Sequence, residues 1–172
     1  MNEVLAVLDR LSDAGDLSGE TAADALRAAG WAVKRQFPGE DFARHWEQGE
    51  LLAGIQGDGP HTRVEFSLWL RSVDTDDDGD DDDWDPDDDT VALDEAYEAA
   101  EAALAALVAE ARGPLAAAGF TAVEEGGVAD EEATGGLDYI AHRAWAGGRR
   151  VLLLGATQDD TDLPVRVVAV VT

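Results

Sequence analysis

Aspartates between positions 74 and 85 are spaced like the ligands of a calcium-binding loop. Calcium takes hard oxygen ligands at alternating positions, and a glycine in sixth place permits the sharp turn of such loops. The pattern starts at Asp74 and has Gly79 in sixth place, but Asp81 occupies the eighth place, where paired calcium loops carry an apolar residue. No helix is expected before the pattern either. The sequence therefore predicts a solvated loop that attracts cations loosely and no specific metal site. The weak calcium alternative would use Asp74, Asp76, Asp78, Asp80, Asp82 and Asp85.

The residue types that most often carry catalysis show no active-site pattern. The three histidines, His45, His61 and His142, fall in three different predicted segments, and no HExxH spacing is present. No serine lies in a GxSxG elbow, and the glycine pairs match neither a P-loop nor a GxGxxG fingerprint. Carboxylates are so numerous that a pair of them with glycosidase-like spacing does not indicate an active site. We therefore expect a protein that is not an enzyme, with no catalytic residues and no cofactor.

The composition excludes several further functions. The 172 residues include no cysteine, and 38 acidic side chains against 12 basic ones give a formal net charge of −26. Such a surface repels phosphate groups, so direct binding to nucleic acid or to an anionic membrane is not expected. Without cysteine, disulfides and thiolate metal sites are excluded. The first residues lack the pattern of a signal peptide, and no apolar run of about 18 residues occurs. We therefore expect a cytoplasmic protein.

The negative charge is concentrated in one segment. Twelve aspartates and no basic residue lie between Asp74 and Asp89, which leaves −14 for the rest of the chain. A block of like charges repels itself and has nothing to bury, so residues 74–89 are predicted to form an acidic low-complexity loop. The length suits a single domain spanning residues 1–172, with this loop inside it.

Hydrophobic periodicity predicts two helices and then strands in the first 73 residues. Apolar residues recur at helical spacing over 4–11 and 22–29, with Ser18 as N-cap and Gly30 as the stop of the second helix. Residues 31–37 predict a strand. Strict alternation of apolar and polar residues over 63–71 predicts a second strand, paired as a hairpin with residues 51–56. This alternation places Trp69 on the polar face of the strand.

The longest predicted helix covers residues 91–112. Its predicted apolar stripe includes Leu104 and Val108, and its acids lie elsewhere. Pro114 has no amide hydrogen for the carbonyl of Glu110, so Gly113 and Pro114 should stop or kink it. Strands are then predicted over 120–125, 137–145, 149–156 and 164–172. The last is apolar almost throughout, which suggests a central position. The fold class is therefore α+β: an antiparallel sheet packed by one long helix, with two short N-terminal helices and the disordered acidic loop.

A compact acidic domain without catalytic residues can act by covering a basic target, as inhibitors of nucleases do. Three stretches and the helix from residue 91 carry a resemblance that fits this role: residues 22–31 (AADALRAAGW), 63–70 (RVEFSLWL) and 144–154 (AWAGGRRVLLL). The chain resembles small actinobacterial proteins regarded as immunity proteins of polymorphic toxin systems. These proteins are similar in size and in their final pair of strands after W-x-G. The polyaspartate insert departs from their pattern.

The resemblance implies a toxin-binding role and no catalytic residues. We therefore expect an immunity or inhibitor protein that binds and neutralises a cognate, basic toxin. The alternatives are an adaptor of the secretion-chaperone type, in which a helix-backed sheet holds a partner segment, and a DNA mimic or calcium-responsive acidic module. From hot-spot chemistry and predicted exposure, the expected partner-binding residues are Trp46, Trp69, Trp84, Tyr97, Glu47, Glu65, Asp83 and Asp85.

Overall fold

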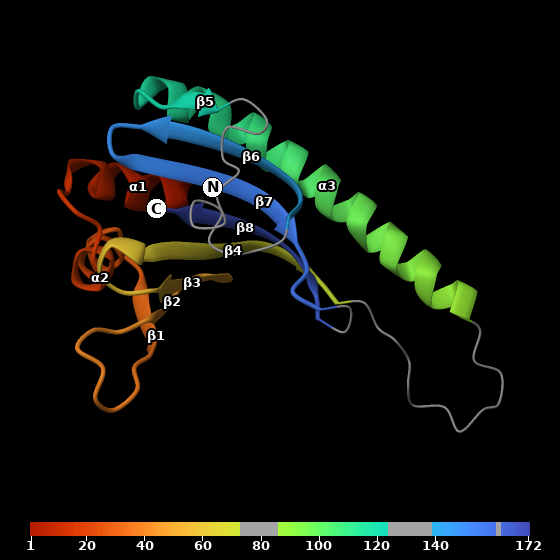
Figure 1. The fold of residues 1–172 in the computed structure, drawn as a ribbon, viewed down its shortest axis with the longest axis horizontal. Coiled ribbons are helices and arrows are strands. Elements are labelled where there is room, and N and C mark those ends of the chain that lie inside the picture. The colour runs from red at the N-terminus through yellow and green to blue at the C-terminus, as the bar shows by residue number, and fades with distance from the viewer. Residues whose placement is uncertain (73–85, 124–138, 161–162) are drawn as a thin grey trace.

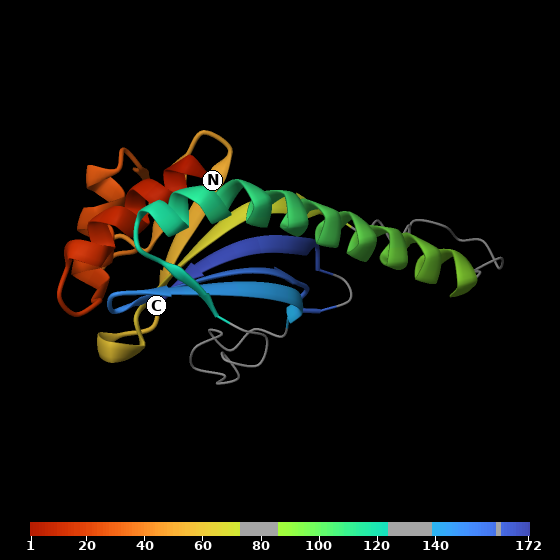
Figure 2. The ribbon, with the colours of Figure 1, turned by 90° about the horizontal axis from the view of Figure 1, so that it is seen from above.

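The computed structural model describes residues 1–72, 86–123, 139–160 and 163–172. Within them, eight strands form one antiparallel sheet in the order β1-β2-β3-β4-β8-β7-β6-β5 (Figure 1). Three α-helices cover one face of this sheet, as the edge-on view in Figure 2 shows. The predicted fold class is confirmed: an α+β chain with an antiparallel sheet, one long helix and two short N-terminal helices.

The two N-terminal helices form where the sequence predicts them. Helix α1 spans Asn2–Asp13 and helix α2 spans Gly19–Ala28. The Ser18 hydroxyl accepts a hydrogen bond from the Thr21 amide at 3.2 Å, which confirms Ser18 as the N-cap of α2. Gly30 follows the helix with φ of 91°, a left-handed conformation that glycine adopts without strain.

Four strands follow α2: β1 (Ala32–Arg35), β2 (His45–Gln48), β3 (Leu51–Gln56) and β4 (Arg63–Arg71). Strands β3 and β4 form the predicted hairpin, with a 3₁₀ turn at Gly59–His61 between them. The sequence reasoning missed β2. This strand has only four residues and a mixed polar and aromatic composition, too short for alternation to indicate a strand.

Helix α3 spans Pro86–Ala117 and differs from the prediction at both ends. It begins at Pro86, a residue favoured in the first turn, so residues 87–89 belong to the helix and not to the loop predicted over 74–89. It also continues through Pro114. Ala111 and Leu115, on either side of that proline, are fully buried, and their burial holds the helix together beyond the lost hydrogen bond. No helix in the described part of the chain is long and apolar enough to cross a membrane.

The C-terminal third supplies the other half of the sheet: β5 (Thr121–Val123), β6 (Tyr139–Gly147), β7 (Arg150–Thr157) and β8 (Val165–Val171). Strand β8 lies between β4 and β7, and Val165 and residues 167–171 are buried, so its predicted central position is confirmed. The tight turn before β7 has Gly148 at φ of 60°, as its glycines predicted.

The two faces of the sheet differ in what packs on them. On the helix face, side chains such as Val64, Phe66 and Leu152 join the apolar sides of α1, α2 and α3 in the main core. No described helix covers the other face, which we call the open face (Figures 1 and 2). Leu153, Val168 and Val170 are nevertheless buried there, with Tyr139 packed against them.

Candidate functional site

Trp46, expected to be an exposed anchor for a partner, is instead a core residue. Its side chain points to the helix face and is only 1% exposed. The indole Nε1 donates a hydrogen bond to the carbonyl oxygen of Ala43 at 2.8 Å, and the Arg27 guanidinium lies 5.6 Å from the ring centroid. A buried tryptophan with its polar atom satisfied stabilises the fold and cannot contact a partner directly.

Trp69 also faces the helix side and not the polar side that alternation predicted. A bulge between Ser67 and Trp69 inserts an extra residue into β4, so Trp69 pairs with Val167 on the helix face. Leu68 and Trp69 both pack, half-buried, against the main core. A bulge of one residue reverses the side to which every later side chain points, and this explains the error.

Glu47 and Glu65 lie on the open face, two strands apart, in different environments. Glu47 is exposed, and its carboxylate is 3.9 Å from the Lys34 ammonium. Glu65 is only 7% exposed and accepts a hydrogen bond from Arg166 at 3.1 Å. Glu47 is therefore accessible to a partner, whereas Glu65 is held inside the protein.

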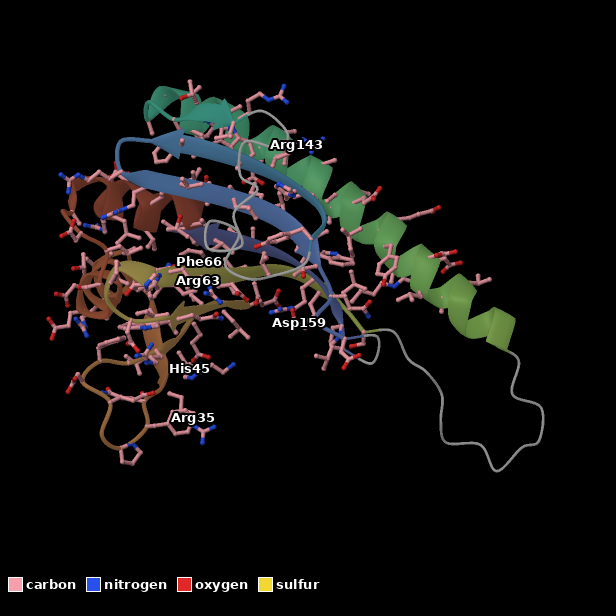
Figure 3. The ribbon with its side chains drawn as sticks, in the orientation of Figure 1. Arg35, His45, Arg63, Phe66, Arg143 and Asp159 are labelled. Atoms are coloured by element: carbon pink, nitrogen blue, oxygen red, sulfur yellow. The ribbon has the colours of Figure 1, made fainter. Side chains whose placement is uncertain are left out.

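Glu65 belongs to a polar network that runs across the open face from β3 to the end of β7. Arg63 donates to the Gln56 amide oxygen at 2.6 Å, and the Gln56 amide nitrogen donates to Glu65. Arg166 continues the network by donating to Asp159 at 2.7 Å. Figure 3 shows Arg63 and Asp159 at the two ends of this network. Its charges neutralise one another, so the network holds strands together and offers little free charge to a ligand.

Tyr139 lies at the margin of this network. Its ring packs over Gly155, where a Cβ atom would collide with the ring carbons. Burial raises the pKa of the Tyr139 phenol above its ordinary value, and the nearby negative charge of Glu65 raises this pKa further. The phenol is therefore neutral at physiological pH and packs against Leu153, Val168 and Val170.

The other predicted partner residues are scattered or lie outside the described residues. Tyr97, on α3, is half-buried, and its hydroxyl donates to the Gln158 amide oxygen at 2.7 Å. This bond ties α3 to the loop after β7, and the rest of the Tyr97 side chain stays partly accessible. Trp84, Asp83 and Asp85, together with the weak calcium candidates, fall outside the described residues.

The three histidines are not brought together. His45 lies on β2 and His142 on β6, with four strands between them in the sheet, and His61 ends the 3₁₀ turn. Figure 3 shows His45 on the lower side of the molecule beside Arg35, far from β6. Over the described ranges, no three metal-ligating side chains gather in one place.

A row of exposed carboxylates lies near the N-terminal end of α3. We call Asp94, Glu95 and Glu98 the acidic flank. Helix α3 has 32 residues and is about 48 Å long, whereas the longest strands have nine residues and span about 30 Å. The helix therefore extends past the sheet, as Figures 1 and 2 show. Only Glu95 has an ion pair among the described residues, with Arg71 at 3.5 Å.

A groove of about 810 Å³ lies between α3 and β6, and we call it the α3–β6 groove. Its wall on the sheet side is formed by residues 139–143 of β6. Figure 3 shows Arg143 between this strand and the helix. The helix wall consists of Glu101, Leu104, Ala105, Val108, Ala109 and Arg112. The sequence reasoning assigned Leu104 and Val108 to the buried stripe of α3 and so missed the groove at the margin of that stripe.

Comparison with known proteins gave no match among protein-family models, curated proteins or solved structures. The accessible acids and the α3–β6 groove, derived from the geometry alone, are therefore the candidate functional surfaces.

Proposed function

We propose that this chain is a non-catalytic immunity or inhibitor protein that binds and neutralises a cognate basic toxin in the cytoplasm. The observation that carries the proposal is the acidic flank on a helix that extends past the sheet. Carboxylates held on a packed helix meet a basic surface without the entropic cost of ordering a loop. The charge of −14 outside the polyaspartate segment accelerates the encounter with such a partner.

The proposal predicts that a toxic domain is encoded beside this chain, and co-expression with that domain tests it. We expect growth to be restored and a stable complex to elute from gel filtration. Continued killing at full expression, with no complex, would contradict the proposal.

The acidic flank is tested by the charge-reversing double variant Asp94→Lys, Glu98→Lys. Both side chains are exposed, so the fold should be retained. We expect the Kd for the toxin domain, measured by calorimetry, to rise about tenfold or more, which corresponds to about 1.4 kcal/mol.

The matched control is the double variant Asp9→Lys, Asp41→Lys, which changes the net charge equally at exposed acids on α1 and on the loop before β2. We expect the control to bind within about threefold of the parent protein, a difference below 1 kcal/mol. Equal weakening by both double variants would show that net charge, and not the flank, determines affinity.

The second candidate function is an adaptor of the secretion-chaperone type. It is favoured by the α3–β6 groove, which lies between a helix and the strand next to the sheet edge and can hold a partner segment. The gene neighbourhood separates the two functions. A neighbouring gene for a large, multidomain secreted polypeptide that ends in a small toxic domain favours immunity.

A further inference from the structure

We propose that a corner of the sheet formed by Arg35, Phe37 and His45, which we call the β1–β2 corner, binds a side-chain carboxylate on an extended segment of a protein partner. Arg35 ends β1 and pairs with His45, which begins β2. All three side chains are exposed, and Figure 3 shows Arg35 and His45 on the same side of the molecule. The corner and its chain neighbours lie within the described residues 1–72. The inference goes beyond the proposed function, because the acidic flank attracts a base whereas this corner offers a cation.

Arg35 is an exposed cation without an acidic partner, although the chain has 38 acidic residues against 12 basic ones. Other exposed or half-buried arginines form ion pairs with carboxylates, among them Arg27, Arg44, Arg71, Arg149 and Arg166. Within the described part of the chain, Arg35 forms no ion pair and its guanidinium donates no hydrogen bond. Two acids of this region are engaged elsewhere: Glu40 accepts from the Phe37 amide at 2.9 Å, and Glu47 lies 3.9 Å from Lys34. The guanidinium of Arg35 is therefore available to a ligand.

The guanidinium of Arg35 is held over an aromatic ring. Its central carbon lies 4.1 Å from the centroid of the Phe37 ring, well inside the range of about 6 Å over which a cation is attracted to a ring face. An arginine that stacks on a ring keeps its N–H donors in its own plane, where they remain free to bind. Two of these donors match the two oxygens of a carboxylate. The stacked arginine is thus prepared for a carboxylate.

The Phe37 ring is itself fixed by the turn that follows β1. Besides its bond to the Glu40 carboxylate, Phe37 accepts a hydrogen bond from the Glu40 amide at 3.2 Å, and the Gln36 side chain donates to the Glu40 carbonyl at 3.0 Å. The His45 ring meets the Phe37 ring at 77°, with the centroids 5.9 Å apart. Phe37 is nevertheless 41% exposed. A ring held in place with free apolar surface contacts a partner at little entropic cost.

The partner segment must supply an acid and an apolar side chain on the same side. Alternate residues of an extended segment point to one face, about 7 Å apart, so an acid and an aliphatic residue separated by one residue can reach Arg35 and Phe37 together. Nucleic acids and anionic membranes carry many phosphates and are repelled by the net charge of −26. A single carboxylate meets mainly the charges within about 8 Å at physiological ionic strength, since more distant charges are largely screened. The corner therefore favours an acidic segment of a protein.

The test uses the full chain and the palindromic peptide acetyl-Thr-Leu-Thr-Glu-Thr-Leu-Thr-amide, which places leucine two residues from glutamate in either direction. By calorimetry at about 150 mM salt, we expect binding about tenfold tighter than for the peptide with Gln in place of Glu. The peptide with Ser in place of both Leu residues should also bind more weakly. In NMR spectra, the amide shifts of residues 34–37 and 45 should change. Absence of binding, equal affinity for the Glu and Gln peptides, or shift changes confined to other elements would overturn the inference.

Variants of Arg35 separate its guanidinium from net charge. Arg35→Glu should lose the Glu peptide and prefer the peptide with Lys in that place. Arg35→Lys keeps the charge but not the planar donors, so it should weaken binding about threefold or more. The matched control Arg149→Glu changes the net charge equally at a side chain that is 74% exposed, and it should leave the preference for Glu unchanged. Equal effects of Arg35→Glu and Arg149→Glu would contradict the inference.

Other occupants of the corner would give different results. If inorganic phosphate binds as tightly as the Glu peptide, the corner is a general anion site and the inference fails. It also fails if the parent protein forms a dimer in sedimentation experiments and Arg35→Glu abolishes this dimer, because the occupant is then a second copy of the chain. Neutralisation of the toxin tests only the proposed function, and Arg35→Glu should retain it. Loss of peptide binding and loss of neutralisation are therefore separate outcomes.

Discussion

Arg150 joins two parts of the fold that are 139 residues apart in the sequence. It belongs to β7, and its buried guanidinium donates hydrogen bonds to the carbonyl oxygens of Leu11, Ala14 and Gly15 at the end of α1. The first residue after α1, Ala14, has an extended backbone and not the left-handed cap. Its amide donates to the Leu11 carbonyl at 3.2 Å, and Arg150 supplies side-chain donors to all three carbonyls. A cation at this end also complements the helix dipole.

Replacement of Arg150 by Met is expected to lower the free energy of unfolding by about 3 kcal/mol. The variant keeps the apolar stem but removes the guanidinium donors to Leu11, Ala14 and Gly15. Hydrogen bonds to charged groups contribute about 1.5–3 kcal/mol each. Urea unfolding measures the effect. Burial lowers the pKa of the guanidinium, and Arg149 lowers it further, but an arginine stays charged at neutral pH.

Arg149→Met is the matched control for this prediction. Its side chain is 74% exposed and, among the described residues, forms an ion pair only with the fully exposed Asp16, so its loss should cost less than about 0.5 kcal/mol. Equal destabilisation by the two substitutions would show that Arg150 does not anchor α1.

At the scale of elements, α3 holds a glycine inside the helix and a second glycine just beyond it. A Cβ atom added to Gly113 would meet no atom within 4 Å apart from its chain neighbours, one of which is Pro114, and this position lies inside the helix. Gly119, in contrast, has φ of 83° where the helix has ended, a conformation that costs other residues about 1–2 kcal/mol. The two glycines therefore have different roles.

Gly113→Ala is expected to change the free energy of unfolding by less than about 0.5 kcal/mol. Alanine has less backbone freedom to lose when the helix forms, but its Cβ is crowded by the Cδ of Pro114, which disfavours helical backbone before proline. Gly119→Ala should lower the free energy of unfolding by about 1 kcal/mol. Thermal unfolding followed by circular dichroism measures both. A change in Tm of more than about 2 °C for Gly113→Ala would contradict the small effect expected there.

At the scale of the whole molecule, the charge acts mainly on the rate of encounter. The nine aspartates from Asp74 to Asp85 contribute strongly to the net charge of −26. The Debye length is about 8 Å at physiological ionic strength, so charges farther than this from the partner are largely screened once a complex has formed. Long-range attraction and short-range contact can therefore be separated by kinetics.

Replacement of these nine aspartates by serine is expected to slow toxin association several-fold at low ionic strength. The dissociation rate should stay unchanged, because the acidic flank is intact. Stopped-flow measurements at about 20 mM and about 200 mM salt check this, since screening should remove the difference at the higher concentration. A faster dissociation rate in the variant would place the aspartate segment within the interface.

The sequence alone determined the elements whose signals are local. The cap at Ser18, the stop at Gly30, the hairpin of β3 and β4 and the central strand β8 were predicted because neighbouring residues carry their periodicity and turn chemistry. The acids of α3 were likewise expected to lie off its apolar stripe, and the exposed acidic flank agrees with that pattern.

Only the tertiary structure decided which of the predicted partner residues are accessible. Trp46 entered the core through β2, a strand too short to predict, and a bulge turned Trp69 toward the helices. The contact of Arg150 with α1 and the groove between α3 and β6 depend on segments distant in the chain. Periodicity shows which side of an element is apolar, but the packing of distant elements determines which side chains reach the surface.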